Sequence, residues 1–162
     1  LRAYSHDAQA AYCLGTIMTA MNRTAEAEAL FRRALRWKPG FPEALNNLAG
    51  ILARSNRQDE AVALYEQAIA ENPRFAEAHN NLASLLAAGG KMEEALARYR
   101  QALEIDPAYL NARLNMANLL MQTGRKESAL EELRKVLEID PGNKFAKEMI
   151  GETGSPSPLA VR

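Results

Sequence analysis

The sequence has 162 residues, and its 20 basic and 20 acidic side chains leave no formal net charge. This length suits one domain with an ordinary core, and the even charge balance without a basic cluster disfavours a nucleic-acid partner. No apolar run reaches membrane-spanning length and no segment resembles a signal peptide, so we expect no membrane insertion. The single cysteine, Cys13, excludes an internal disulfide and is compatible with a cytoplasmic location without fixing it.

A unit of 34 residues repeats along the chain, and the prolines at positions 39, 73, 107 and 141 mark it. Four further rows of residues keep the same spacing. They are Leu14, Leu48, Leu82 and Met116; Gly15, Ala49, Ala83 and Ala117; Ala27, Ala61, Ala95 and Ala129; and Phe31, Tyr65, Tyr99 and Leu133. Small and large residues in register predict stacked copies of one structural unit.

The first predicted elements are a short remnant and a helix. We interpret residues 1–7 as the loosely held remnant of a preceding repeat, because residues 1 and 2 are in register with the end of a later helix. A first helix follows at residues 8–21, where Leu14, Ile17 and Met21 share one face at helical spacing.

Each first helix is followed by a tight turn and a second helix. Positions 22, 56, 90 and 124 hold only Asn or Gly, the residues that best tolerate a left-handed backbone. Thr24 is placed to cap the helix after the first turn. The second helices are predicted at residues 24–37, 58–71, 92–105 and 126–139. The repeated prolines stop these helices, because proline lacks a backbone donor and disfavours helix in the residue before it.

The C-terminal end is predicted to be a short cap. Residues 144–151 begin another first helix, to which Lys144, Lys147 and Glu148 give a polar outer face. Residues 152–162 are rich in Gly, Ser and Pro, and we expect them to form a flexible tail.

These motifs resemble the tetratricopeptide repeat over residues 8–143. The shared positions are the small residue beside the first helix's Leu, the early Ala of the second helix, the aromatic four residues later, and the closing Pro. The resemblance implies an all-α fold, a right-handed superhelical solenoid of antiparallel helix pairs with units at residues 8–41, 42–75, 76–109 and 110–143. The family's large aromatic early in the first helix is absent, which removes one packing residue; Ala11, Leu45, His79 and Arg113 stand there.

The sequence offers no constellation for catalysis. His6 and His79 are far apart, neither has a Cys or His at metal-ligand spacing, and His79 is expected to be packed. Cys13 has no basic neighbour in sequence and is expected to be a buried, inert thiol. We therefore predict no enzyme activity, no metal and no cofactor for these residues.

A second, polar face of the first helices carries the functional signal. In the tetratricopeptide superhelix this face lines a concave groove, which here is small, polar and rich in asparagine. The predicted groove residues are Glu43, Asn46, Asn47 and Arg54; Glu77, Asn80, Asn81 and Ser84; and Asn111, Asn115, Asn118 and Gln122.

The phrases NNLAG, NNLAS and LNMAN resemble the repeats of the O-linked N-acetylglucosamine transferase type. In that type an asparagine ladder grips the backbone of bound polypeptide, and the matching residues here are Asn47, Asn81 and Asn115, with Cys13 in that place in the first unit. A carboxamide offers donors and an acceptor, so it can pair with a peptide unit whatever the side chain. The alternative is that these asparagines only bond to neighbouring helices.

The sequence therefore predicts a protein-interaction module that binds an extended peptide or partner segment in the concave groove. Two alternatives stay open: a substrate-selecting arm of a larger enzyme such as a glycosyltransferase, and a self-assembling scaffold. A clamp for a C-terminal carboxylate is disfavoured, because Glu43 and Glu77 stand where it would need cations and Arg54 is the only clear cation on this face.

The N-terminal end is predicted to be uncovered. The helix at residues 8–21 would normally pack against the second helix of a preceding unit, so Tyr12, Ile17 and Met21 should be partly exposed. Contiguous exposed apolar surface is usually covered by something, so this end is the expected contact of a homo-oligomer.

Overall fold

The computed structural model describes the backbone of residues 2–154 and the side chains of residues 7–151. This part of the chain is all helical, as predicted. The helices are α1 (Arg2–Ala20), α2 (Thr24–Trp37), α3 (Pro42–Arg54), α4 (Gln58–Glu71), α5 (Ala76–Ala88), α6 (Met92–Ile105), α7 (Leu110–Gln122), α8 (Lys126–Ile139) and α9 (Lys144–Gly154). The four second helices have the predicted bounds.

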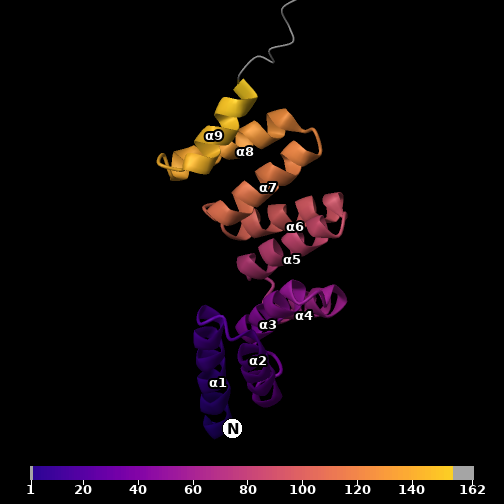
Figure 1. Ribbon diagram of the computed structural model, residues 1–162, viewed down its shortest axis with the longest axis vertical. Coiled ribbons are helices and arrows are strands. Elements are labelled where there is room, and N and C mark those ends of the chain that lie inside the picture. Colours follow the sequence, from indigo (N-terminus) through magenta and orange to yellow (C-terminus); the bar gives the residue numbers. More distant parts are fainter. Residues whose placement is uncertain (1, 155–162) are drawn as a thin grey trace, which may run out of the picture.

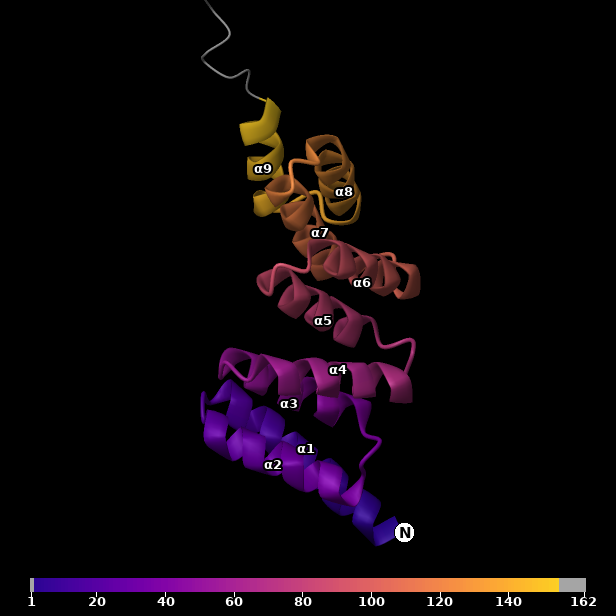
Figure 2. The ribbon, with the colours of Figure 1, turned by 90° about the vertical axis from the view of Figure 1, so that its right-hand side faces the viewer.

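The helices form antiparallel pairs that stack into a solenoid. Each first helix packs on the second helix of its own pair, and each second helix packs on the first helix of the next pair. Figure 1 and Figure 2 show, from two directions, the pairs following one another along the long axis, from α1–α2 at one end to α9 at the other. One continuous cluster of buried side chains runs from α2 to α8, so the core is shared between neighbouring pairs.

The turns inside the pairs have the predicted left-handed residue. Asn22 and Asn56 have φ values of 61° and 60°, and Gly90 and Gly124 have values of 81° and 76°. After the first of these turns the amide of Arg23 donates to the carbonyl of Met18 at 2.9 Å, and the other three turns make the same bond. This six-to-one bond ends each first helix at a fixed residue and sets the direction of the second.

The predicted cap at Thr24 is wrong. Arg23 holds the N-cap position of α2 and makes no side-chain capping bond, while Thr24 is the first helical residue. The reason is the shortness of the link: only Arg23 separates the left-handed residue from the helix. Its guanidinium forms an ion pair with Glu26 instead, at 2.6 Å.

The terminal helices are both longer than predicted. α1 is continuous from Arg2, because Ser5 stands where the later units have the proline that stops a helix. α9 continues through Gly151 to Gly154, past the predicted end of the cap, while residues 155–162 of the predicted tail lie outside the described residues. The C-terminal end is also less polar than expected, since Phe145 is 45% exposed.

Small residues where the two helices of a pair cross allow the helices to approach closely. Ala49, Ala83 and Ala117 are fully buried, as is the ring of Phe31. A methyl group built on Gly15 would lie 2.7 Å from Cε1 of Phe31, closer than carbon atoms can approach. The first pair therefore needs glycine at this crossing, whereas the later pairs accommodate alanine.

Filling one of these crossings should destabilise the fold. Ala83→Leu is expected to cost on the order of 1–3 kcal/mol in the free energy of unfolding, because the buried crossing cannot accept the added volume. Urea unfolding followed by circular dichroism measures the change. The exposed Ala63 of α4 is the matched control, and Ala63→Leu should leave stability nearly unchanged. Equal stabilities for the two variants would contradict the tight crossing.

Candidate peptide-binding groove

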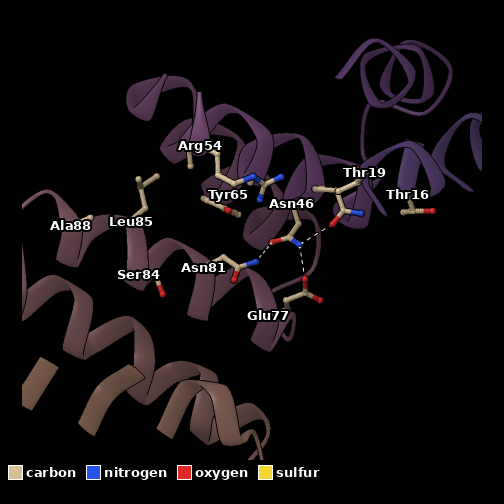
Figure 3. Close-up of a pocket in the computed structure, with 13 residues that line it drawn as sticks. Thr16, Thr19, Asn46, Arg54, Tyr65, Glu77, Asn81, Ser84, Leu85 and Ala88 are labelled. Carbon is tan, nitrogen blue, oxygen red and sulfur yellow. Dashed lines mark hydrogen bonds between the residues drawn. The ribbon is translucent and has the colours of Figure 1, made fainter. Parts of the chain in front are cut away.

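Two adjoining clefts follow the inner faces of the first helices. The larger has a volume of about 520 Å³ and the smaller about 290 Å³, and Ser84 and Ala88 line both. The larger is lined by Thr16, Thr19, Asn46, Asn47, Gly50, Ala53, Arg54, Tyr65, Glu77, Asn81, Ser84, Leu85 and Ala88, and is shown in Figure 3. The smaller is lined by Ser84, Ala87, Ala88, Tyr99, Asn115, Asn118, Leu119 and Gln122. We call the two clefts together the groove.

Most of the predicted groove residues line it, and three do not. Asn46, Asn47, Arg54, Glu77, Asn81 and Ser84 line the larger cleft, and Asn115, Asn118 and Gln122 the smaller. Glu43 is exposed in the first turn of α3 and Asn111 is exposed at the start of α7, and neither lines a cleft. Asn80 is buried beneath the groove surface.

Hydrogen bonds join five asparagines into a chain across α3, α5 and α7, which we call the amide chain. Nδ2 of Asn115 donates to Oδ1 of Asn80 at 3.0 Å, and Nδ2 of Asn80 to Oδ1 of Asn81 at 3.1 Å. Nδ2 of Asn81 then donates to Oδ1 of Asn46 at 3.1 Å, and Asn46 to Oδ1 of Asn47 at 3.4 Å. The bonds from Asn115 and Asn81 cross between neighbouring pairs, so the asparagines do bond to neighbouring helices.

The amide chain ends differently on its two sides. At the N-terminal side Asn46 also donates to Oε1 of Glu77 at 3.0 Å, and Figure 3 shows this bond beside the one to Asn81. At the same end, the hydroxyl of Tyr12 interacts with the last amide of the chain, Asn47. Burial has the largest effect on the pKa of this hydroxyl and raises it, the carboxylate of Glu43 raises it further, and the interaction with Asn47 lowers it. At the C-terminal side Leu114 stands where the earlier units have Asn46 and Asn80, so no amide continues the chain.

Some hydrogen-bond donors and acceptors of the amide chain remain unused. Asn81 and Asn115 are half-buried, and each uses one of its two Nδ2 hydrogens within the chain. The Oδ1 of Asn115 accepts no hydrogen bond from the described residues. The internal bonds fix how these amides point, and both side chains line the groove.

The floor of the groove comes from tyrosines on the second helices. Oη of Tyr99 lies 2.9 Å from Oγ of Ser84, and Tyr65 occupies the equivalent place one pair earlier. Burial raises the pKa of the Tyr65 hydroxyl to about 12, so it carries its proton at neutral pH. From the sequence, both tyrosines were predicted only as members of a repeated row of mostly large residues and not as groove residues. The available signal was the hydroxyl, which Phe31 and Leu133 lack at the same position of the repeat.

Two of the four residues that stand in place of the family's aromatic residue, His79 and Arg113, make hydrogen bonds that support the fold. Nε2 of His79 makes a hydrogen bond of 3.1 Å with the carbonyl of Pro73, and the ring is buried as expected. Nε and Nη2 of Arg113 donate to the carbonyl of Pro107 in the same way, and Nη1 forms an ion pair with Glu132 at 2.6 Å. These side chains tie the helix-ending proline to the next first helix.

Cys13 is exposed, so the expectation of a buried thiol is wrong. It stands at the position of the repeat that Asn47 occupies in α3, and among the described residues no helix precedes α1 to cover it. Among the described residues no group of three or more His, Cys, Asp and Glu side chains could hold a metal ion. None of the described helices combines the length and apolar character needed to cross a bilayer.

Comparison with known proteins shows the family. The model of the tetratricopeptide repeat matches residues 18–85, 55–98 and 85–147. These matches cover most of the sequence, and the chain belongs to the tetratricopeptide repeat family. A comparison with curated proteins finds no match.

Solved structures share this fold. PilF of Pseudomonas aeruginosa superposes with a TM-score of 0.84 at 21% identity, over 93% of this chain and 71% of PilF. YrrB, described as a TPR protein with an unusual peptide-binding site, gives 0.73 at 26% identity, over 87% and 73%. The first TPR of Spaghetti (RPAP3), bound to the HSP90 peptide SRMEEVD, gives 0.70 at 21% identity, over 74% and 95%.

Removing the middle of the amide chain should destabilise the protein. Asn80 is buried, and Asn80→Ala removes the donor to Oδ1 of Asn81 and the acceptor for Nδ2 of Asn115, so we expect a loss of about 1–3 kcal/mol. Thermal and urea unfolding measure it. Asn118→Ala is the control, because this side chain is exposed and makes no hydrogen bond with the described residues. A loss no larger than that of the control would mean that the chain contributes nothing to stability.

Proposed function

We propose that this chain is a non-catalytic interaction module that holds an extended segment of a partner protein in the groove. The observation that carries the proposal is the row of half-buried amides that line the clefts and keep unused donors and acceptors. An extended polypeptide has unpaired N–H and C=O groups along its length, and a carboxamide can serve either group. Recognition of this kind depends on the partner's backbone more than on its side chains.

The amide chain favours such binding because its side chains are held in place before the partner arrives. A free asparagine on a helix surface would lose rotamer freedom on binding, and that loss weakens affinity. Here the bonds from Asn81 to Asn46 and from Asn115 to Asn80 have already fixed the amides. The structural use of the asparagines and their use in binding are therefore compatible.

The relatives support the same class of function. Spaghetti is described with a bound peptide and YrrB with a peptide-binding site, which makes a peptide a reasonable occupant here too. The resemblance of Asn47, Asn81 and Asn115 to the ladder of O-linked N-acetylglucosamine transferase repeats favours backbone recognition. Arg54 is the only cation that lines the two clefts, which disfavours a clamp built from several cations.

Binding should depend on Asn81. The probe is the tightest-binding peptide from a displayed library of random twelve-residue sequences, measured by fluorescence anisotropy. Asn81→Ala is expected to weaken its binding about two- to tenfold, the value of one or two hydrogen bonds. Asn80→Ala is the matched variant, because it interrupts the same amide chain from below without lining the groove.

A larger loss for Asn81→Ala than for Asn80→Ala supports direct contact with the peptide. Unchanged affinity for Asn81→Ala would count against the groove as the binding site. Equal losses for both variants would assign the asparagines a positioning role only.

Self-assembly is the second candidate function, and α1 carries the observation that favours it. Leu14 and Ile17 are 45% and 52% exposed, whereas Leu48 and Ile51, at the same positions of α3, are buried against α2. Residues 8–22 contain no charged side chain. Asp7 and Arg23 flank this stretch, so two copies of α1 packed antiparallel would bring opposite charges together at both ends.

Self-association should depend on this face of α1. Sedimentation velocity at rising concentration is expected to show a monomer–dimer equilibrium that Ile17→Glu shifts to monomer. Phe145→Glu, which changes an exposed apolar residue at the other end, should leave the dimer intact. A wild-type protein that stays monomeric at high concentration, or a dimer lost in Phe145→Glu alone, would contradict the α1 contact.

A further inference from the structure

Gly50 leaves a gap in the wall of the larger cleft. The same position of the repeat holds Thr16, Gly50, Ser84 and Asn118 in the four units. In the third pair Ser84 fills the position and bonds to Oη of Tyr99 at 2.9 Å. In the second pair no side chain fills it, so the hydroxyl of Tyr65 faces the cleft.

The Tyr65 hydroxyl is a polar group without a partner in an otherwise buried residue. Tyr65 is only 4% exposed, yet it lines the larger cleft. Its Oη makes no hydrogen bond with the part of the chain that the structure describes. The hydroxyl oxygen itself is open to the cleft, since Nδ1 of His79 is the only buried side-chain nitrogen or oxygen without a partner among the described residues. An unpaired hydroxyl held in place by a buried ring and open to a cleft is available to a ligand atom. Burial keeps the pKa of this hydroxyl at about 12, so at neutral pH it can donate a proton in a hydrogen bond.

Arg54 reaches the same gap. A methyl group built on Gly50 would lie 3.5 Å from Oη of Tyr65 and 3.7 Å from Nη1 of Arg54. Figure 3 shows both side chains on the same wall of the cleft. Arg54 forms no ion pair with the described residues, and the other units have Ala20, Ala88 and Gln122 at its position. A neutral donor and a cationic donor thus flank one unfilled volume, which we call the Gly50 notch.

We propose that the Gly50 notch binds the carboxylate of an aspartate or glutamate side chain, with Arg54 and Tyr65 as its donors. A carboxylate has two acceptor oxygens and no donor, which matches one guanidinium and one phenol that both donate. Glu77 lines the same cleft and makes a more highly charged anion less favourable there. The inference deepens the proposed function and rests on it for the peptide context: the segment in the groove carries an acidic residue beside α3.

Small probes test the notch without requiring an extended segment. N-acetylglutamate N-methylamide supplies the side-chain carboxylate, and N-acetylglutamine N-methylamide is its neutral isostere. N-acetylalanine supplies a chain-end carboxylate, and inorganic phosphate a more highly charged anion. Each is titrated to about 100 mM into the isotope-labelled full chain, and NMR follows the amide of Gly50 and Nε of Arg54. We expect saturable shifts with the glutamate compound and binding about tenfold weaker with the glutamine compound.

Three variants and one control separate the notch from general effects. Gly50→Ser places in the notch the hydroxyl that Ser84 provides in the third pair, and its added carbon makes only ordinary contacts. It should keep the fold and abolish glutamate binding. Arg54→Gln should reduce binding about tenfold and Tyr65→Phe about two- to fivefold, whereas Tyr99→Phe should have no effect.

The outcomes decide the notch and the groove separately. Absence of shifts, equal shifts with the glutamine compound, or unchanged binding in Gly50→Ser overturns the notch, even where displayed peptides bind through Asn81. Tighter binding of N-acetylalanine or of phosphate overturns the assignment to an acidic side chain. If the glutamate compound binds but Asn81→Ala leaves the peptide affinity unchanged, the notch is supported and the amide chain is rejected as the peptide contact.

Discussion

The structure depends on the close approach of helices at small residues. A single helix pair cannot bury its apolar stripe, so each pair is stable only when its second helix covers the next first helix. Within each pair, the fully buried Ala49, Ala83 and Ala117 allow the two helices to approach closely, and Gly15 does so against the ring of Phe31. Because every pair repeats the same crossing, the inner faces of the first helices are aligned along one side of the solenoid. The groove follows from this alignment.

The same asparagines of the groove stabilise the stacking of the helix pairs and keep hydrogen-bonding groups that a ligand can use. The amide chain joins neighbouring pairs through Asn81 and Asn46 and through Asn115 and Asn80, so it reinforces the stacking that creates the groove. Only some of its donors and acceptors are used in doing so. Departures from the repeat then give the groove its individual character, as Gly50 does by leaving the Tyr65 hydroxyl open to the larger cleft.

The features that every unit shares could be predicted from the sequence, whereas the features in which one unit differs from the others could not. The bounds of the second helices and the left-handed turns could be predicted, because residues such as Asn22 and Gly90 have a single effect on the backbone. The bounds of the two terminal helices could not. The bonds within the amide chain could not be predicted, because they depend on how far apart neighbouring pairs lie. The Gly50 notch was not predicted, because its two donors, Arg54 and Tyr65, come from different helices. They flank a common space only because residue 50 has no side chain. Cys13 was misjudged because its burial depends on a neighbouring helix that the described part of the chain does not contain.

The central claim is that the inner faces of the first helices form the binding surface, and mapping of a bound peptide by NMR tests it most directly. A peptide selected from a displayed library is added to the isotope-labelled chain, and the side-chain amides of Asn81 and Asn115 are followed together with the indole of Trp37. The account predicts saturable shifts at Asn81 and Asn115 and none at Trp37, which lies outside the groove. Shifts at Trp37 with unmoved asparagine amides would contradict it.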